Sequence, residues 1–150
     1  PSRQELPLLA ESAQATLKDI GMDVDINCTA DNNSIVQDTA AWDVYAMANV
    51  QAPTGDPEYW FTVFATSDAT KNQGAYKNEK LDQLEEQLSQ EFDTDKRAKL
   101  AVEMQQTVLD DNAFVYCSFL KMSQISRANV TGYMAHACDY YQVTADLDIN

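Results

Sequence analysis

Hydrophobic and polar positions follow two different periods in the first part of the chain. Over residues 5–20 the apolar residues recur every three or four positions, which predicts an amphipathic helix that ends at Gly21. Over residues 22–27 apolar residues alternate with Asp and Asn, a period of two that predicts a strand with one buried side. A helix, a glycine and a strand in this order predict an αβ unit.

Two longer apolar segments predict strands that are covered on both faces. Residues 42–50 and 113–122 are almost continuously apolar, as is typical of inner strands in a parallel sheet. We expect the first of them to lie centrally. A short helix is expected within residues 29–41, and a turn is expected around Gly132.

Two long amphipathic helices are expected between these strands. Asn78 is the expected N-cap of the first, whose apolar stripe begins at Leu81. Thr94 is the expected N-cap of the second, where Arg97 occupies the position at which a capping box has Glu or Gln. Together the elements predict an α/β fold: residues 1–150 form a single lobe, an open and mostly parallel sheet flanked by helices.

The loop after the first long strand is the candidate ligand site. In open α/β sheets, ligands bind beyond the carboxyl ends of the strands. Two prolines stiffen residues 51–57, and Asp56 is the expected N-cap of a helix that begins at Pro57, which gives both residues a structural role. For the aromatic residues that follow, core packing is the alternative to ligand stacking. The predicted ligand wall consists of the loop and two aromatic supports: Gln51, Ala52, Pro53, Thr54, Gly55, Tyr59 and Trp60.

Composition limits the classes of partner. The chain has 24 acidic and 10 basic residues and a formal net charge of -14, which argues against nucleic acid because phosphate binding depends on Lys and Arg. No apolar run has the length of a membrane span, and residues 1–9 lack the features of a signal peptide. Because the chain begins without Met and close to a helix, we interpret it as part of a longer protein.

Motifs for catalysis and metal binding are missing from the sequence. His136 is the single histidine, and GxSxG, GxxxxGK and GxGxxG do not occur, so we predict no catalytic residue, no metal ligand and no cofactor. Cys28, Cys117 and Cys138 are too few for a disulfide framework, and we expect buried structural thiols. A hydrolase that uses paired carboxylates stays open as an alternative function, because such pairs form in space rather than in sequence.

The chain contains the segments ELPLLAESAQATLKDIGMDVDI and WDVYAMANVQAPTGDPEYWF and, later, NVTGY. The order of these motifs resembles the carboxyl-terminal lobe of the solute-binding proteins of ABC importers for peptides and nickel. Asp56-Pro57 is similar to the family's DP motif, and Tyr76, Asn78 and Asp82 are similar to its Y-x-N-x-x-x-D helix start, which implies structural roles for Tyr76 and Asn78.

The resemblance implies a type II periplasmic-binding-protein-like lobe and a function in transport rather than catalysis. It implies a second, N-terminal lobe that is missing here, a membrane permease as partner, and an extracytoplasmic location, periplasmic or anchored outside the cell as a lipoprotein. The ligand would be a metal chelate or a small peptide. Peptide-binding members carry an aspartate shortly before the DP motif, and residues 51–55 contain no acid, so the resemblance favours a nickel or metal chelate. Residues 65–77 contain no histidine, so direct coordination of nickel by this lobe is not expected.

Overall fold

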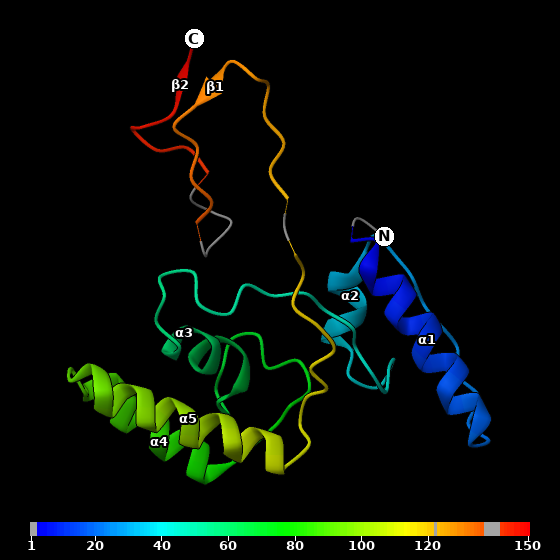
Figure 1. The fold of residues 1–150 in the computed structure, drawn as a ribbon. Helices are drawn as coiled ribbons and strands as arrows, with labels where there is room; N and C mark the ends of the chain where they lie inside the picture. Colours follow the sequence, from blue (N-terminus) through cyan, green and yellow to red (C-terminus); the bar gives the residue numbers. More distant parts are fainter. Residues whose placement is uncertain (1–2, 122, 137–141) are drawn as a thin grey trace.

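The computed structural model describes residues 3–121, 123–136 and 142–150 (Figure 1). In chain order, the elements are helices α1 (Glu5–Asp19), α2 (Asn32–Gln37) and α3 (Glu58–Trp60), the π-helix η1 (Phe61–Ala65), helices α4 (Glu79–Gln90) and α5 (Thr94–Asp110), and strands β1 (Val130–Thr131) and β2 (Asp148–Ile149).

The hydrophobic core lies where α4 and α5 pack against α3 and η1. The expected leucine stripe of α4 is buried, and Met104 and Val108 of α5 are fully buried against it. Figure 1 shows α4 and α5 side by side, with α3 and η1 over one side of the pair. The core cluster consists of Trp60, Phe61, Phe64, Ala65, Leu81, Leu84, Leu88, Ala101, Met104 and Val108.

The caps of the two long helices decide where they begin. The prediction for α4 is confirmed, because the Asn78 side chain accepts a hydrogen bond from the Leu81 N–H at 2.9 Å. The prediction that Thr94 caps α5 is wrong: Asp93 is the N-cap and accepts from the Lys96 N–H at 3.0 Å. A carboxylate at this position both satisfies a free N–H and interacts favourably with the positive end of the helix dipole.

The expected strands do not form a parallel sheet in the described residues. Residues 22–27, 42–50 and 113–121 have no assigned strand, and the described pairing is the antiparallel one of β1 with β2. A strand exists only where a neighbouring backbone completes its hydrogen bonds, and none of the described backbone hydrogen bonds pairs these segments. Several of their apolar side chains are correspondingly open to solvent, with Val115 88% exposed and Phe119 83% exposed, whereas Met47, Ala113 and Phe114 are half-buried against the core.

The turn expected around Gly132 is confirmed as the end of β1. Gly132 has a φ of +74°, and the carbonyl of Asp146 lies so close to it that a Cβ would collide. A glycine is therefore required there, and it allows residues 130–131 to pair with residues 148–149. Figure 1 shows this pair well away from the helical core, at the end of a long irregular segment.

The first helix is confirmed, but it has no buried residue. Helix α1 spans Glu5–Asp19, one residue shorter than expected, and Leu8 remains largely exposed. The expectation of buried thiols is wrong for Cys28 and Cys117, which are both free and exposed because the segments that carry them are uncovered. Cys138 lies outside the described residues.

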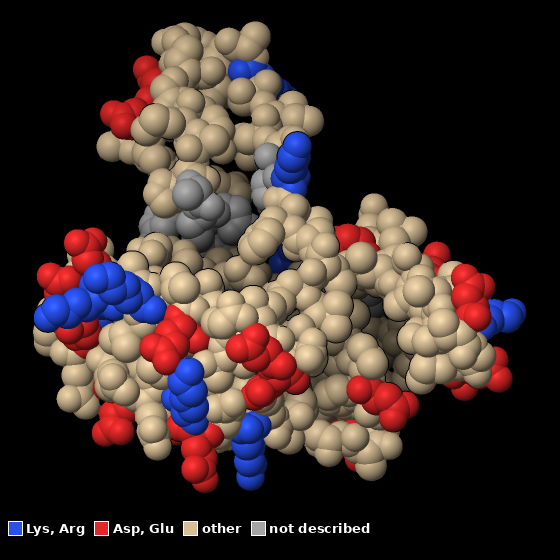
Figure 2. All heavy atoms as spheres, turned by 60° about the horizontal axis from the view of Figure 1, so that its bottom comes forward, with Lys and Arg blue, Asp and Glu red and all other residues tan. Residues whose placement is uncertain are grey.

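Charged side chains of both signs are spread over the surface. Figure 2 shows Asp and Glu interspersed with Lys and Arg across the face turned forward, with no continuous acidic patch. Among the described helices, none has the length and apolar character needed to cross a membrane.

Candidate functional site

The candidate ligand loop contains a tight turn. The Gly55 N–H donates to the Ala52 carbonyl at 3.0 Å, which closes a four-residue turn with Pro53 in its second position. Proline is favoured there because its φ is already fixed, and Gly55, with a φ of +83°, supplies the left-handed conformation at the end of the turn. The sequence therefore determines the local shape of this loop.

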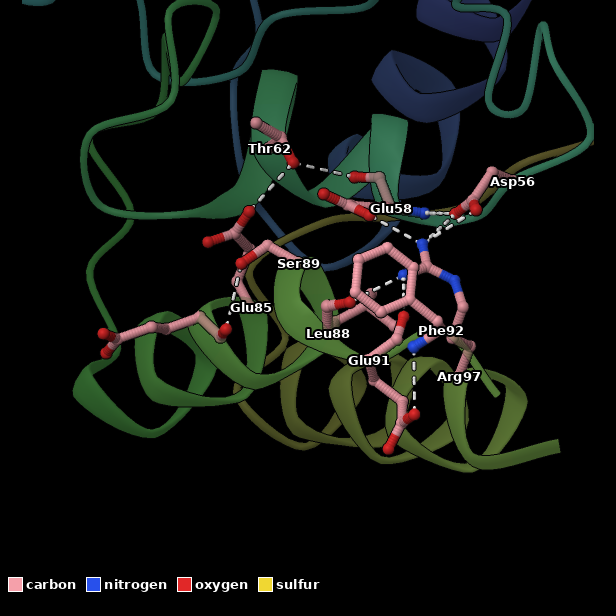
Figure 3. A network of polar contacts seen from close by, with 10 residues as sticks. Asp56, Glu58, Thr62, Glu85, Leu88, Ser89, Glu91, Phe92 and Arg97 are labelled. Atoms are coloured by element: carbon pink, nitrogen blue, oxygen red, sulfur yellow. Dashed lines mark hydrogen bonds and ion pairs between the residues drawn. The ribbon is translucent and has the colours of Figure 1, made fainter. Parts of the chain in front are cut away.

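Asp56 connects the turn to two other elements. Helix α3 begins at Glu58, one residue later than expected, so the prediction that Asp56 is its N-cap is wrong by one residue: the N-cap is Pro57, which makes no side-chain cap bond. One Asp56 carboxylate oxygen still accepts from the Glu58 N–H at 2.9 Å and satisfies a free N–H at the start of the helix. Both Asp56 oxygens also accept from one terminal nitrogen of Arg97, at 2.9 and 2.7 Å. Asp56 is thus bonded directly to α5, a contact that the sequence did not predict (Figure 3).

Arg97 joins the loop to the helical core. The nitrogen that binds Asp56 also donates to Glu58 at 2.6 Å, and the other terminal nitrogen donates to the carbonyls of Leu88 and Glu91 at 2.6 and 2.7 Å. The Arg97 side chain is 18% exposed. A single guanidinium from α5 therefore holds the loop, the start of α3 and the end of α4 (Figure 3).

The contacts in this network lower the pKa of Asp56 and raise the pKa of Arg97. Burial opposes ionisation of Asp56, but the hydrogen bonds from Glu58 and Arg97 and the Arg97 charge outweigh it and hold the Asp56 pKa below its usual 3.8. Hydrogen bonds to Glu58 and Asp56 raise the pKa of Arg97. Since the folded-state pKa of Asp56 is depressed, its contribution to stability is present above the unfolded value and is lost as pH falls through the folded value.

The residues of the predicted ligand wall lie on an open surface. Gln51, Ala52 and Pro53 are half-buried, whereas Thr54 and Gly55 are exposed. Two hollows on the described surface lie elsewhere, one on α5 beside Val102 and one between α1 and residues 22–25. The role of the loop as a ligand wall stays a prediction.

The two aromatic supports differ in their surroundings. Trp60 is buried in the core, with its ring centroid 5.3 Å from those of Phe61 and Phe114. Tyr59 is exposed, and its ring meets the edge of Phe64 at 6.4 Å. Trp60 therefore packs against aromatic residues of the core, while Tyr59 is the one with an accessible ring, and the role of either as a support for a ligand stays a prediction.

Tyr76 and Asn78 meet at the carboxylate of Asp111. The Tyr76 hydroxyl donates to Asp111 at 2.7 Å and the Asn78 amide donates to the same oxygen at 2.6 Å, so the start of α4 is tied to the end of α5. Burial and the neighbouring Asp111 raise the pKa of Tyr76 to about 12. Hydrogen bonds from Tyr76 and Asn78 lower the pKa of Asp111. This geometry supports the predicted structural role of both residues.

Metal-binding side chains do not gather in the part of the chain that the structure describes. Among residues 3–121, 123–136 and 142–150, no three His, Cys, Asp or Glu side chains lie where they could hold a metal ion together.

Sequence reasoning missed the connecting residues of the site, Arg97, Glu58 and Asp111. A signal for Arg97 was present, because a cation near the start of a helix lies at the positive end of the helix dipole and is unfavourable there without acidic partners. That signal predicts nearby carboxylates but does not identify them. The partners of Arg97 are Asp56 and Glu58, which lie 41 and 39 positions away along the chain, and helical periodicity does not predict such a pairing.

Comparisons with known proteins agree with the resemblance drawn from the motifs. No family model matches the sequence. The sequence is 29% identical over 99 residues to the nickel-binding protein NikA of Staphylococcus aureus (strain NCTC 8325 / PS 47), a match that covers 66% of this chain and 20% of NikA. The crystal structure of NikA from Staphylococcus aureus in complex with Ni(L-His)2 matches with a TM-score of 0.80 at 23% identity, over 99% of this chain and 32% of that chain.

These matches confirm the predicted resemblance and show the fold at a coarse level. The chain follows the path of part of a periplasmic-binding-protein-like fold, although its expected strands lack the hydrogen bonds of a sheet in the described residues. The chain spans well under half the length of NikA.

Proposed function

We propose that this chain is the substrate-capture lobe of an ABC-importer solute-binding protein and that its ligand is nickel carried by a small chelator. The observation that carries the proposal is the similarity to NikA in both sequence and fold. The absence of an acid in residues 51–55 supports a chelate over a free peptide, since a peptide's amino terminus calls for a carboxylate. The protein would bind and release its ligand without chemical conversion.

The exposed apolar segments support a lobe that is completed by further chain. Residues 113–121 and 42–50 carry the composition of inner strands and follow the path of the NikA fold. In the proposed two-lobed protein they pair with strands from further chain, forming the mostly parallel sheet of this lobe. The loop at residues 51–55 then forms one wall of a cleft whose other wall is the second lobe.

The proposed partners and location follow from this function. A solute-binding protein delivers its ligand to a membrane permease, so we propose an extracytoplasmic location, with or without a lipid anchor. The interspersed charges of α4 and α5 keep this surface soluble and free of a phosphate-binding patch (Figure 2).

Calorimetric titration of the full-length protein tests the proposal. Ni(L-His)2, Ni²⁺ alone, L-histidine alone and an unmodified tripeptide are the four probes, and we expect saturable binding of Ni(L-His)2 with weaker binding of each other probe. Tighter binding of the tripeptide would overturn the chelate preference. A copurifying sugar or polyol, seen by native mass spectrometry, would overturn both ligand classes.

A matched pair of threonine variants tests the position of the ligand wall. Thr54 lies exposed in the candidate loop, whereas Thr70 lies exposed in the loop between η1 and α4. We expect Thr54→Ala to weaken binding of Ni(L-His)2 by about threefold to tenfold, the effect of losing one hydrogen bond, and Thr70→Ala to leave it unchanged. Equal effects of the two variants would remove residues 51–55 from the site.

A further inference from the structure

We propose that Arg97 is the positioning residue of the ligand site: it fixes the conformation of residues 51–56 and thereby sets the affinity for the ligand. The proposal rests on the proposed function for its second half and on the hydrogen-bond network for its first. Arg97 does not belong to the ligand wall. It acts on the wall through Asp56, the residue that directly follows the turn.

The four N–H groups on the terminal nitrogens of Arg97 face five acceptor atoms from three parts of the fold. Two are the oxygens of Asp56, one is an oxygen of Glu58, and two are the carbonyls of Leu88 and Glu91. The planar fork of a guanidinium reaches acceptors on two sides at once, which the compact ammonium of a lysine does not. The position therefore requires arginine rather than any cation.

The helix ends around Arg97 explain why the side chain turns away from its own helix. Arg97 lies near the start of α5, where the helix dipole disfavours a cation, and its nitrogen donates to carbonyls at the end of α4, where a cation is favoured. The side chain therefore bridges from an unfavourable helix end to a favourable one. In doing so it is directed at Asp56 (Figure 3).

The loop has few other restraints. In the described part of the chain, the hydrogen bonds that involve residues 51–56 are the Gly55 to Ala52 backbone bond and the bonds made by Asp56. Without Arg97, the carboxylates of Asp56 and Glu58 would stand close together without a neutralising charge, and their repulsion would open the loop. Loss of Arg97 therefore both removes an anchor and introduces a force against the folded loop.

Three variants of the full-length protein test the proposal. Arg97→Met removes the guanidinium while keeping an apolar stem, Arg97→Lys keeps the charge without the fork, and Lys96→Met is the matched control. Lys96 is the neighbouring cation, and its exposed side chain forms an ion pair with Glu91 at 3.7 Å. Exposed ion pairs of this kind contribute little to stability. Hydrogen exchange measured by mass spectrometry compares the peptide covering residues 50–58 with the peptide covering residues 98–106.

We expect the loop peptide of ligand-free Arg97→Met to exchange at least about tenfold faster than in the native protein, with the α5 peptide unchanged. Arg97→Lys should give a smaller increase, and Lys96→Met none. Affinity for Ni(L-His)2 should fall by about tenfold in Arg97→Met, by a smaller factor in Arg97→Lys and not at all in Lys96→Met, because a disordered loop must be ordered before it binds.

The outcomes separate this proposal from the proposed function. Native exchange of the loop peptide in Arg97→Met would overturn the positioning role, and so would faster exchange in both peptides, which indicates general destabilisation. Faster loop exchange with native affinity for Ni(L-His)2 would overturn the link to binding. If the native protein does not bind Ni(L-His)2, the proposed ligand is wrong, and the exchange measurements still decide whether Arg97 holds the loop.

Discussion

Leu88 and Phe119 are both large apolar residues in segments for which the sequence predicts regular structure, yet Leu88 is fully buried and Phe119 is 83% exposed. Leu88 lies on α4, in the core that α4 and α5 form with α3 and η1. Phe119 lies in the drawn-out segment that leads from this core to β1 (Figure 1). The two residues represent two regions of one chain that differ in how much they depend on neighbouring segments for their structure.

The difference shows how far each kind of element depends on its neighbours. A helix completes its backbone hydrogen bonds within itself and needs only a partner for its apolar stripe, which α4 and α5 supply to each other. A buried strand needs neighbours for both edges and both faces. Residues 113–121 have no pairing strand in the described part of the chain, and although Phe114 packs against the core, Val115 and Phe119 are exposed. The segment therefore has strand composition without strand structure.

The largest expected effect is on the free energy of unfolding when one large apolar side chain in each region is replaced by alanine. Leu88→Ala should lower the free energy of unfolding by about 2–5 kcal/mol, because it removes buried contacts and leaves a cavity in the core. Phe119→Ala should change it by less than about 0.5 kcal/mol in the 150-residue chain, since its side chain is already in water. Urea titration of both variants measures the difference. A large effect of Phe119→Ala would show that residues 113–121 are covered in solution.

Hydrogen exchange measured in the 150-residue chain and in the full-length protein sharpens the comparison. In the 150-residue protein, amides of residues 113–121 should exchange nearly as fast as in a free peptide, whereas amides around Met104 should be protected. In the full-length protein, pairing with further strands should slow exchange over residues 113–121 by about a hundredfold or more. Unchanged fast exchange in the full-length protein would contradict the proposed sheet.

The sequence predicted the elements that are stabilised locally. The helix at residues 5–20, the leucine stripe of α4 and the cap at Asn78 depend on residues three or four positions apart, and the structure confirms all three. The predicted cap of α5, Thr94, was wrong by one residue, because the neighbouring Asp93 has an equally suitable side chain and only geometry distinguishes the two. The parallel sheet depends on partners that local patterns do not contain.

The turn in the candidate loop was predictable, but the contacts that support it were not. Proline, glycine and aspartate in residues 51–57 indicate a stiff turn before a helix, and the turn at Gly55 is present. The bonds from Arg97 to Asp56 and from Tyr76 to Asp111 join residues far apart in the chain. Such contacts arise from the packing of the helices, which sequence periodicity alone does not determine.

A smaller effect is expected from two tyrosines at the edge of the core. Burial, then Asp111, raises the pKa of Tyr76 to about 12, and burial raises that of Tyr116 to about 12. Unfolded tyrosine titrates near pH ~10, so the folded state binds each proton more tightly, and this stabilisation is lost as pH rises from about 10 toward 12. Urea titrations near pH ~8 and ~11 should show less alkaline destabilisation in Tyr76→Phe and Tyr116→Phe, and least in the double variant. An unaltered pH dependence in the double variant would contradict the assignment.

The smallest effect compares a helix of the core with a helix outside it. Asp93 caps α5 through a hydrogen bond from the Lys96 N–H, whereas Asp31 precedes α2 without a side-chain cap bond. Asp93→Ala should therefore cost about 0.5–2 kcal/mol of unfolding free energy and Asp31→Ala about zero, although both remove one exposed aspartate. Asp93→Asn keeps the acceptor and should restore most of the loss, as urea titration would measure. Equal costs for the two alanine variants would mean that net charge, rather than the cap, determines the effect, because both variants change the charge by the same amount.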